Sequence, residues 1–223
     1  MRSTRPLQLQ LALRFGAILA DKRQVGVFVI GFAAFLQLWS IQALLPTLAT
    51  VFHADEAEVS LTVSATTIAV TLMAPFIGIA ADILGRRRII TIGLFLLVVP
   101  TALIASATTL NEIVLYRFIQ GLLLPPVFVV AVAYIGDEFP RNEITAVTAT
   151  YTTGSIVGGF LGRFIAGWVG EYGGWRTAYL VLAAIDLVCV IYVATQLPRE
   201  RHFVRAAGLA RTVVLMVRHF RDR

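Results

Sequence analysis

The chain has 223 residues, of which 58% are hydrophobic and only 14% are charged, and it carries a formal net charge of +6. A soluble helical domain keeps a polar face on each helix, so this composition argues against a water-soluble globular protein. With three histidines and a single cysteine, the sequence also predicts no metal centre, no disulfide framework and no resident cofactor.

Six long apolar stretches predict membrane-spanning helices, because a helix needs about 20 apolar residues to cross the hydrocarbon core. Strands would be about half as long and would alternate in polarity. In chain order the predicted helices are Val25–Leu45, Leu61–Ala81, Ile89–Ala107, Glu112–Gly136, Ile144–Gly170 and Thr177–Leu197. Four prolines within these spans predict kinks, namely Pro75, Pro100, Pro125 and Pro126.

The organisation that follows is one bundle over residues 25–198 between two basic flanks. Residues 1–24 are interpreted as a cytoplasmic tail, either a helix lying in the membrane interface or a disordered segment. Residues 199–223 are interpreted as the start of a cytoplasmic loop that is cut off. Of the 19 Lys plus Arg residues, 16 fall in the tails and loops on one side, which predicts that both termini are cytoplasmic. The positive charge is therefore explained by topology, and no nucleic-acid partner is expected.

Two turns share a spacing that indicates an internal repeat. Gly78, Asp82 and Gly85 follow the second span, and Gly167, Glu171 and Gly174 follow the fifth, with gaps of four and three residues in both cases. The two turns lie on opposite membrane faces, as a three-helix unit repeated in inverted topology would place them. A glycine-rich chain can also show such spacing by chance. The predicted fold class is thus an all-α membrane protein with six transmembrane helices in two inverted three-helix repeats.

Three charged residues lie inside the predicted spans away from their ends, where a charge costs about 2.5–3.5 kcal/mol and normally faces a cavity or a partner. By depth, Arg117 is expected near Ser40 and Gln42, where it either holds an anionic group or has a purely structural role. Arg163 and Asp186 differ in depth by about 3 Å, which predicts a salt bridge. Otherwise Arg163 extends toward the interface and Asp186 stays neutral. Asp186 is also the candidate for proton coupling.

Gly154, Gly158 and Gly162 recur every four residues on one face of the fifth span. This spacing is typical of helices that approach closely in membranes, so these residues are predicted to pack the fifth helix on a neighbour.

The turn after the second span resembles the signature loop of the major facilitator superfamily, through Gly78, Asp82, Gly85, Arg86 and Arg87. The run Arg117, Gln120 and Gly121 is similar to the second motif of that family. Residues 154–167 and 197–203 resemble the YnfM-type branch, which is related to arabinose-efflux and multidrug-efflux permeases. The drug-antiporter motif has Gly-Pro where this chain has Gly162-Arg163, which weakens the inference of drug–proton antiport.

The resemblance implies roles for several of these residues. Asp82 would lock one state of the transporter against a second half, and Arg86 would reach Asp137 or Glu138. Alternatively, the basic run Arg86–Arg88 only enforces topology. Helices 1, 2, 4 and 5 would line the substrate pathway, with Gln42, Gln120 and Arg117 as substrate or coupling candidates beside Arg163 and Asp186.

The resemblance also implies a function for the chain, as the N-terminal half of a twelve-helix permease. It would be a secondary active transporter of the bacterial inner membrane that exports a small organic solute by alternating access, with a proton as the coupling ion. It would need the missing C-terminal six-helix half or a second copy. The alternative is a truncated or non-transporting six-helix scaffold. An intramembrane enzyme is disfavoured because His53, His202 and His219 all fall in loops or tails.

Overall fold

The computed structural model describes residues 21–197, so the predictions for the flanks at 1–20 and 198–223 lie outside the described residues. Within that range the regular secondary structure consists of helices, joined by short turns. The elements are α2 (Lys22–Ser40), η1 (Ile41–Leu44), α3 (Leu45–Phe52), α4 (Glu56–Leu84), α5 (Arg86–Ile104), α6 (Leu110–Leu123), α7 (Pro125–Glu138) and α8 (Ile144–Gln196).

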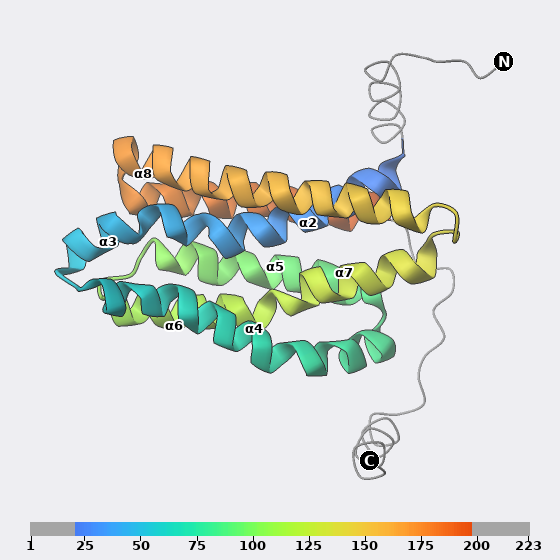
Figure 1. Ribbon diagram of the computed structural model, residues 1–223, viewed down its shortest axis with the longest axis horizontal. Helices are drawn as coiled ribbons and strands as arrows, with labels where there is room; N and C mark the ends of the chain where they lie inside the picture. Colours follow the sequence, from blue (N-terminus) through green and yellow to red (C-terminus); the bar gives the residue numbers. More distant parts are fainter. Residues whose placement is uncertain (1–20, 198–223) are drawn as a thin grey trace, which may run out of the picture.

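These elements make six passes along the long axis of the bundle, which confirms the predicted fold class (Figure 1). Five helical segments of the described range are long and apolar enough to cross a membrane, and α8, with 53 residues, is long enough to cross twice. Figure 1 shows α8 running the length of the bundle and returning beside itself. We call residues 144–173 its first arm and residues 175–196 its second arm.

Two passes are interrupted inside the predicted spans, the fourth of them at two of the prolines for which a kink was predicted. The first pass changes to a 3-10 helix at Ile41–Leu44 and then continues as α3 to Phe52, seven residues past the predicted end at Leu45. The fourth pass breaks at Leu124, directly before Pro125 and Pro126, because a proline lacks the N–H that would continue the helix. By contrast, α4 and α5 continue through their prolines.

The reversals after the second and fifth passes have nearly the same backbone conformation. Gly85 has φ 91° and ψ 138°, and Gly174 has φ 81° and ψ 156°, a region that side-chain-bearing residues rarely adopt. The loop predicted between Gly170 and Thr177 is wrong, since the helix continues on both sides of Gly174. The matching glycines support the inverted repeat that the spacing predicted, because each one joins the second and third helices of a three-helix unit.

The first arm of α8 packs directly on α2 through its glycines. A Cβ atom at Gly154, Gly158 or Gly162 would collide with the backbone of α2, at the carbonyl oxygens of Phe28, Phe32 and Leu36 in turn. The predicted close packing is therefore present, and it fixes the first arm against α2 over several turns.

The interior consists of two apolar clusters with a polar layer between them. One cluster lies toward the end of the bundle that carries Arg86–Arg88, which we call the arginine face, and the other toward the opposite face, near Gly174. In three passes the buried polar residues lie between members of the two clusters. These residues are Thr101 in α5, Arg117 and Gln120 in α6, and Asp186 in α8.

Candidate functional site

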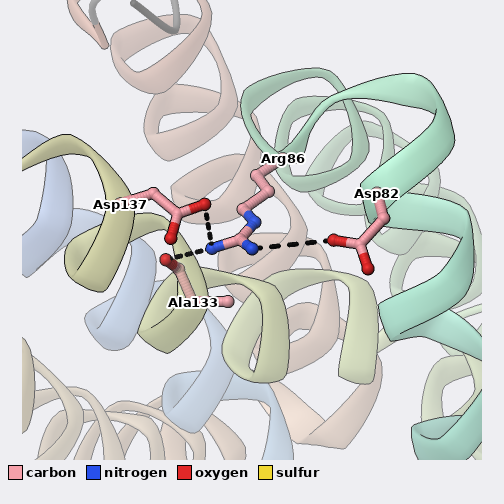
Figure 2. A network of polar contacts seen from close by, with 4 residues as sticks. All are labelled: Asp82, Arg86, Ala133 and Asp137. Carbon is pink, nitrogen blue, oxygen red and sulfur yellow. Dashed lines mark hydrogen bonds and ion pairs between the residues drawn. The ribbon is translucent and has the colours of Figure 1, made fainter. Parts of the chain in front are cut away.

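Arg86 joins three helices at the arginine face (Figure 2). It is the first residue of α5, placed there by the turn at Gly85, and its Nη1 lies 2.7 Å from Oδ2 of Asp137 near the end of α7. Its Nη2 lies 3.6 Å from Oδ1 of Asp82 near the end of α4, and Nη1 also donates to the carbonyl oxygen of Ala133. The predicted contact between Arg86 and Asp137 is therefore present. We call this group the latch.

The latch is weak enough to break. Both carboxylates are about half exposed, at 52%, while the Arg86 side chain is 20% exposed. Ion pairs that water reaches contribute about 0–1 kcal/mol each. The latch therefore holds the ends of α4, α5 and α7 together, but separating them costs little free energy.

Gly78, the first glycine of the signature-like loop, makes no close packing contact among the described residues. A Cβ atom there would have no neighbour within 4 Å among the described residues, and the residue is exposed on α4. Gly78 therefore faces open space within the described part of the chain.

Arg87 has a specific contact at the arginine face, beyond any effect on topology. Its Nε donates to the carbonyl oxygen of Leu197 at 2.7 Å and its Nη2 to that of Ala194 at 2.8 Å, at the end of the second arm of α8. At the opposite face Arg176 donates through Nη2 to the carbonyl oxygen of Ala107 at 2.9 Å, just past the end of α5. Each arginine lies two residues after its reversal glycine, in the first turn of one helix of this pair. It donates to carbonyl oxygens at the C-terminal end of the other helix.

This reciprocal pair of caps follows from the inverted repeat and holds α5 to the second arm at both membrane faces. A cation at the carbonyl end of a helix stabilises it by about 0.3–1 kcal/mol. We expect Arg87→Ala and Arg176→Ala each to lower the free energy of unfolding by about that amount, and Arg88→Ala, at an exposed position, to have no effect. Thermal unfolding in detergent micelles measures this, and an equal loss for Arg88→Ala would refute the assignment.

In the middle of the bundle, Arg117 is fully buried and its guanidinium is enclosed by acceptors. Nε donates to the carbonyl oxygen of Thr62 at 3.3 Å, Nη1 to that of Gln37 at 3.0 Å and Nη2 to that of Leu38 at 3.1 Å. Nη1 also donates to Oε1 of Gln120 at 2.9 Å. The acceptors in the first pass lie one turn earlier than the expected Ser40 and Gln42. Because acceptors of the protein itself enclose the guanidinium, the geometry favours the purely structural role over the binding of an anionic group.

Gln120 extends this polar layer toward α5 and α2. Its Nε2 donates to Oγ1 of Thr101 at 2.8 Å and lies 3.4 Å from Oε1 of Gln37. Thr66 donates to the carbonyl oxygen of Arg117 at 3.1 Å. Sequence reasoning missed Thr62, Thr66 and Thr101. The signal available was a threonine within an apolar span, which often bonds across helices.

Asp186 is fully buried, and neither carboxylate oxygen has a hydrogen-bond partner among the described residues. Its polar neighbour is the side chain of Gln37, whose Nε2 lies 3.5 Å from the carbonyl oxygen of Leu182. The hydroxyl of Tyr179, two turns away on the same arm, is likewise buried with no partner in residues 21–197. Gln37 thus lies between the Asp186 carboxyl group and Arg117, whose Nη1 donates to the carbonyl oxygen of Gln37.

The predicted salt bridge between Arg163 and Asp186 is wrong. Arg163 is exposed on the first arm of α8, whereas Asp186 is buried in the bundle interior. Nε of Arg163 donates to Oε1 of Gln42 at 2.9 Å, and its guanidinium carbon lies 4.8 Å from the ring centroid of Trp39. Equal depth placed the two charges at one level, but the rotation of each helix about its axis turned them to different sides.

The described part of the chain contains no group of three or more His, Cys, Asp or Glu residues that could hold a metal ion. Its charged side chains instead form a latch at one face, reciprocal caps at both faces and a buried arginine layer between them. A six-pass bundle with these features is typical of the membrane proteins that are built from inverted helical repeats.

The comparisons with known proteins agree. The chain matches the Major Facilitator Superfamily over residues 27–222, and it belongs to this family. It is 32% identical over 180 residues to an uncharacterized transporter of Buchnera aphidicola subsp. Acyrthosiphon pisum, covering 81% of this chain and 44% of that protein. It is 28% identical over 200 residues to the inner membrane transport protein YnfM of Escherichia coli, covering 89% and 48%.

Solved structures show the same fold. The peptide transporter POT, in complex with sulfate, superposes with a TM-score of 0.75 at 14% identity, covering 88% of this chain and 43% of that one. A bacterial homologue of the human lysosomal transporter Spinster gives a TM-score of 0.71 at 16% identity, covering 82% and 43%. The chain thus spans about half the length of the relatives it matches. It is a multi-pass membrane protein of a transporter family, and nothing in its family or neighbours points to an enzyme.

Proposed function

We propose that the chain forms one half of a secondary active transporter that moves a small organic solute across a bacterial inner membrane by alternating access. The observation that carries this proposal is the latch, in which Arg86 holds the ends of α4, α5 and α7 together through weak ion pairs. Alternating access requires contacts at one face that form and break with each cycle. Export is the proposed direction, and both termini lie in the cytoplasm, on the side of the arginine face.

The proposal includes a second six-helix half, or a second copy of this chain, on the faces of α4 and the first arm of α8. Both carry exposed side chains of two kinds. Hydroxyl residues such as Thr67 and Thr152 suit a protein partner or an aqueous pathway better than lipid, because polar groups are costly in hydrocarbon. Large apolar residues lie on the same helices, namely Leu61, Ile68, Leu72, Phe76, Ile156, Phe160, Phe164, Trp168 and Tyr172. By helical spacing, the open surface at Gly78 lies on the same side of α4 as Thr67 and Thr71.

Asp186 is the residue that we propose for proton coupling. Its carboxyl group is fully buried and neither oxygen has a hydrogen-bond partner among the described residues, and an acid without an ionic partner inside a membrane span is typical of proton relays. Its neighbour Gln37 contacts both Arg117 and Gln120, so a change at Asp186 reaches the polar layer that joins the first and fourth passes.

The test is counterflow of labelled organic solutes into proteoliposomes that contain the chain, either alone or together with a second six-helix half. We expect flux of at least one solute class. Asp137→Asn should change its rate by up to about fivefold, since it removes an ion pair of about 0–1 kcal/mol. Arg88→Gln is the matched control, because it alters charge at the same face outside the latch.

Two results would count against the proposal. If Asp137→Asn and Arg88→Gln had the same flux as the unaltered chain, the latch would not be a gate. If a folded bundle showed no flux of any solute, with and without a second half, the scaffold alternative would stand.

A further inference from the structure

Arg163 presents a guanidinium group on an open face at membrane depth. It lies in the middle third of the segment from Ile144 to Gly174, and its side chain is exposed. Three contacts fix its orientation: the hydrogen bond to Gln42, a hydrogen bond from Nη1 to the carbonyl oxygen of Gly159 at 3.2 Å, and stacking on Trp39. The stacking is possible because Gly159 lies against the Trp39 ring, where a Cβ atom would come within 3.0 Å.

The positive charge of Arg163 is not balanced by any carboxylate of the described residues. The ion pairs of the latch involve Arg86, at the arginine face. Asp186, the acid at a similar depth, is fully buried in the bundle interior, away from this open face. A guanidinium in the membrane without a counter-charge is costly, so the arrangement favours the arrival of an anion.

The side-chain nitrogen atoms of Arg163 and Gln42 that make no hydrogen bond among the described residues are donors. Arg163 uses Nε and Nη1, which leaves Nη2 without an acceptor among the described residues. Gln42 accepts through Oε1, which leaves its Nε2 donor unused as well within residues 21–197. Two N–H donor groups on side chains that contact each other, one of them charged, match the two oxygens of a carboxylate.

The surroundings define the rest of the ligand. Phe160, one turn before Arg163 on the first arm, is 62% exposed and stacks on Phe164 at a centroid separation of 6.0 Å. One turn before Trp39 in the first pass, Phe35 is partly exposed. Apolar rings therefore border a cluster of donors, which suits a molecule that carries a carboxylate on an aromatic body.

We propose that Arg163, Gln42 and Trp39 form one wall of a binding site for an aromatic carboxylate. This inference rests on the proposed transport function, since it names the substrate class that such a half would hold. Arg163 is the anchor, Gln42 orients it and adds a second donor, and Trp39 keeps its plane fixed.

Benzoate is the probe, titrated by calorimetry into the 223-residue chain in nanodiscs of zwitterionic lipid. We expect saturable binding that the neutral analogue benzamide does not reproduce. Arg163→Gln should weaken benzoate binding by about tenfold or more, the loss expected for a charged hydrogen-bond donor. Arg88→Gln removes the same charge at an exposed position outside the site and should leave binding unchanged.

Gln42→Glu provides an independent variant that keeps Arg163. The introduced carboxylate would neutralise the guanidinium, so the chain should fold normally and lose benzoate binding. Thermal unfolding in the same nanodiscs reports on folding for every variant.

Three outcomes would overturn the inference: no benzoate binding to the folded chain, equal affinity for benzamide, or unchanged benzoate affinity in Arg163→Gln. Each is distinct from failure of the proposed function. Solute counterflow that persists in Arg163→Gln would keep the chain a transporter and remove only the aromatic carboxylate as its ligand.

Discussion

Replacement of Gly158 by alanine is expected to lower the free energy of unfolding by roughly 1–3 kcal/mol, the range for overpacking a tight interior contact. The new methyl group would meet the backbone carbonyl of Phe32, which cannot rotate away as a side chain would. The first arm of α8 would then have to move off α2. Gly154 and Gly162 lie in the same stripe, so their contacts would loosen as well.

Gly136→Ala is the matched control for this change. Gly136 lies within α7 and is exposed, and a Cβ atom there would have no neighbour within 4 Å among the described residues. Alanine favours a helix over glycine by up to about 1 kcal/mol, so this variant should be neutral or slightly more stable. The midpoint of thermal unfolding in detergent micelles compares the two. Equal midpoints would show that the stripe is not the tight interface described above.

Arg117→Ala is expected to be the other strongly destabilising substitution, with a loss of roughly 2–5 kcal/mol. The change removes a large buried side chain and the charged donor shared by Thr62, Gln37 and Leu38. Oε1 of Gln120 would also lose its hydrogen-bond donor. The first, second and fourth passes meet at this one guanidinium, so its loss affects all three.

Arg163→Ala is the control, because it removes the same residue type at a similar depth from an exposed position. Its hydrogen bond to Gln42 and its stacking on Trp39 are open at the surface, so we expect a loss below about 1 kcal/mol. Unfolding in detergent micelles again gives the comparison. A larger loss for Arg163→Ala than for Arg117→Ala would reverse the assignment of structural and ligand-facing arginines.

The six passes could be predicted from local sequence, and the latch from the family resemblance of the turn before Arg86. Apolar runs of sufficient length specify helices in a bilayer, because every backbone polar group must be satisfied within its own segment. The contact of Arg86 with Asp137, one of two acids expected at the end of the fourth pass, came from the resemblance of this turn to the signature loop of the family. The reversal at Gly174 was missed as a single-residue turn, since its flanks Glu171 and Arg176 resemble a polar loop.

The candidate site was predicted less well. The sequence identified Arg117, Arg163, Asp186 and Gln42 as important, yet it paired Arg163 with Asp186 and placed Gln42 beside Arg117. Both errors came from ranking residues by depth alone. In a soluble helix the apolar stripe fixes which side faces the interior. A membrane helix that is apolar all round carries no such stripe, so its rotation is not encoded by pattern.

The sequence by itself determined that most of the chain lies in a lipid bilayer. It also determined the number and order of the passes, the inverted repeat and the charge asymmetry between the two faces. These are properties of segment length, composition and spacing. The tertiary structure decided which charges meet, and it separated a buried arginine that joins three passes from an exposed arginine with donors to spare. That division arises from close packing, since the glycine contacts of α8 with α2 set the rotation of the first arm and thereby turn Arg163 outward.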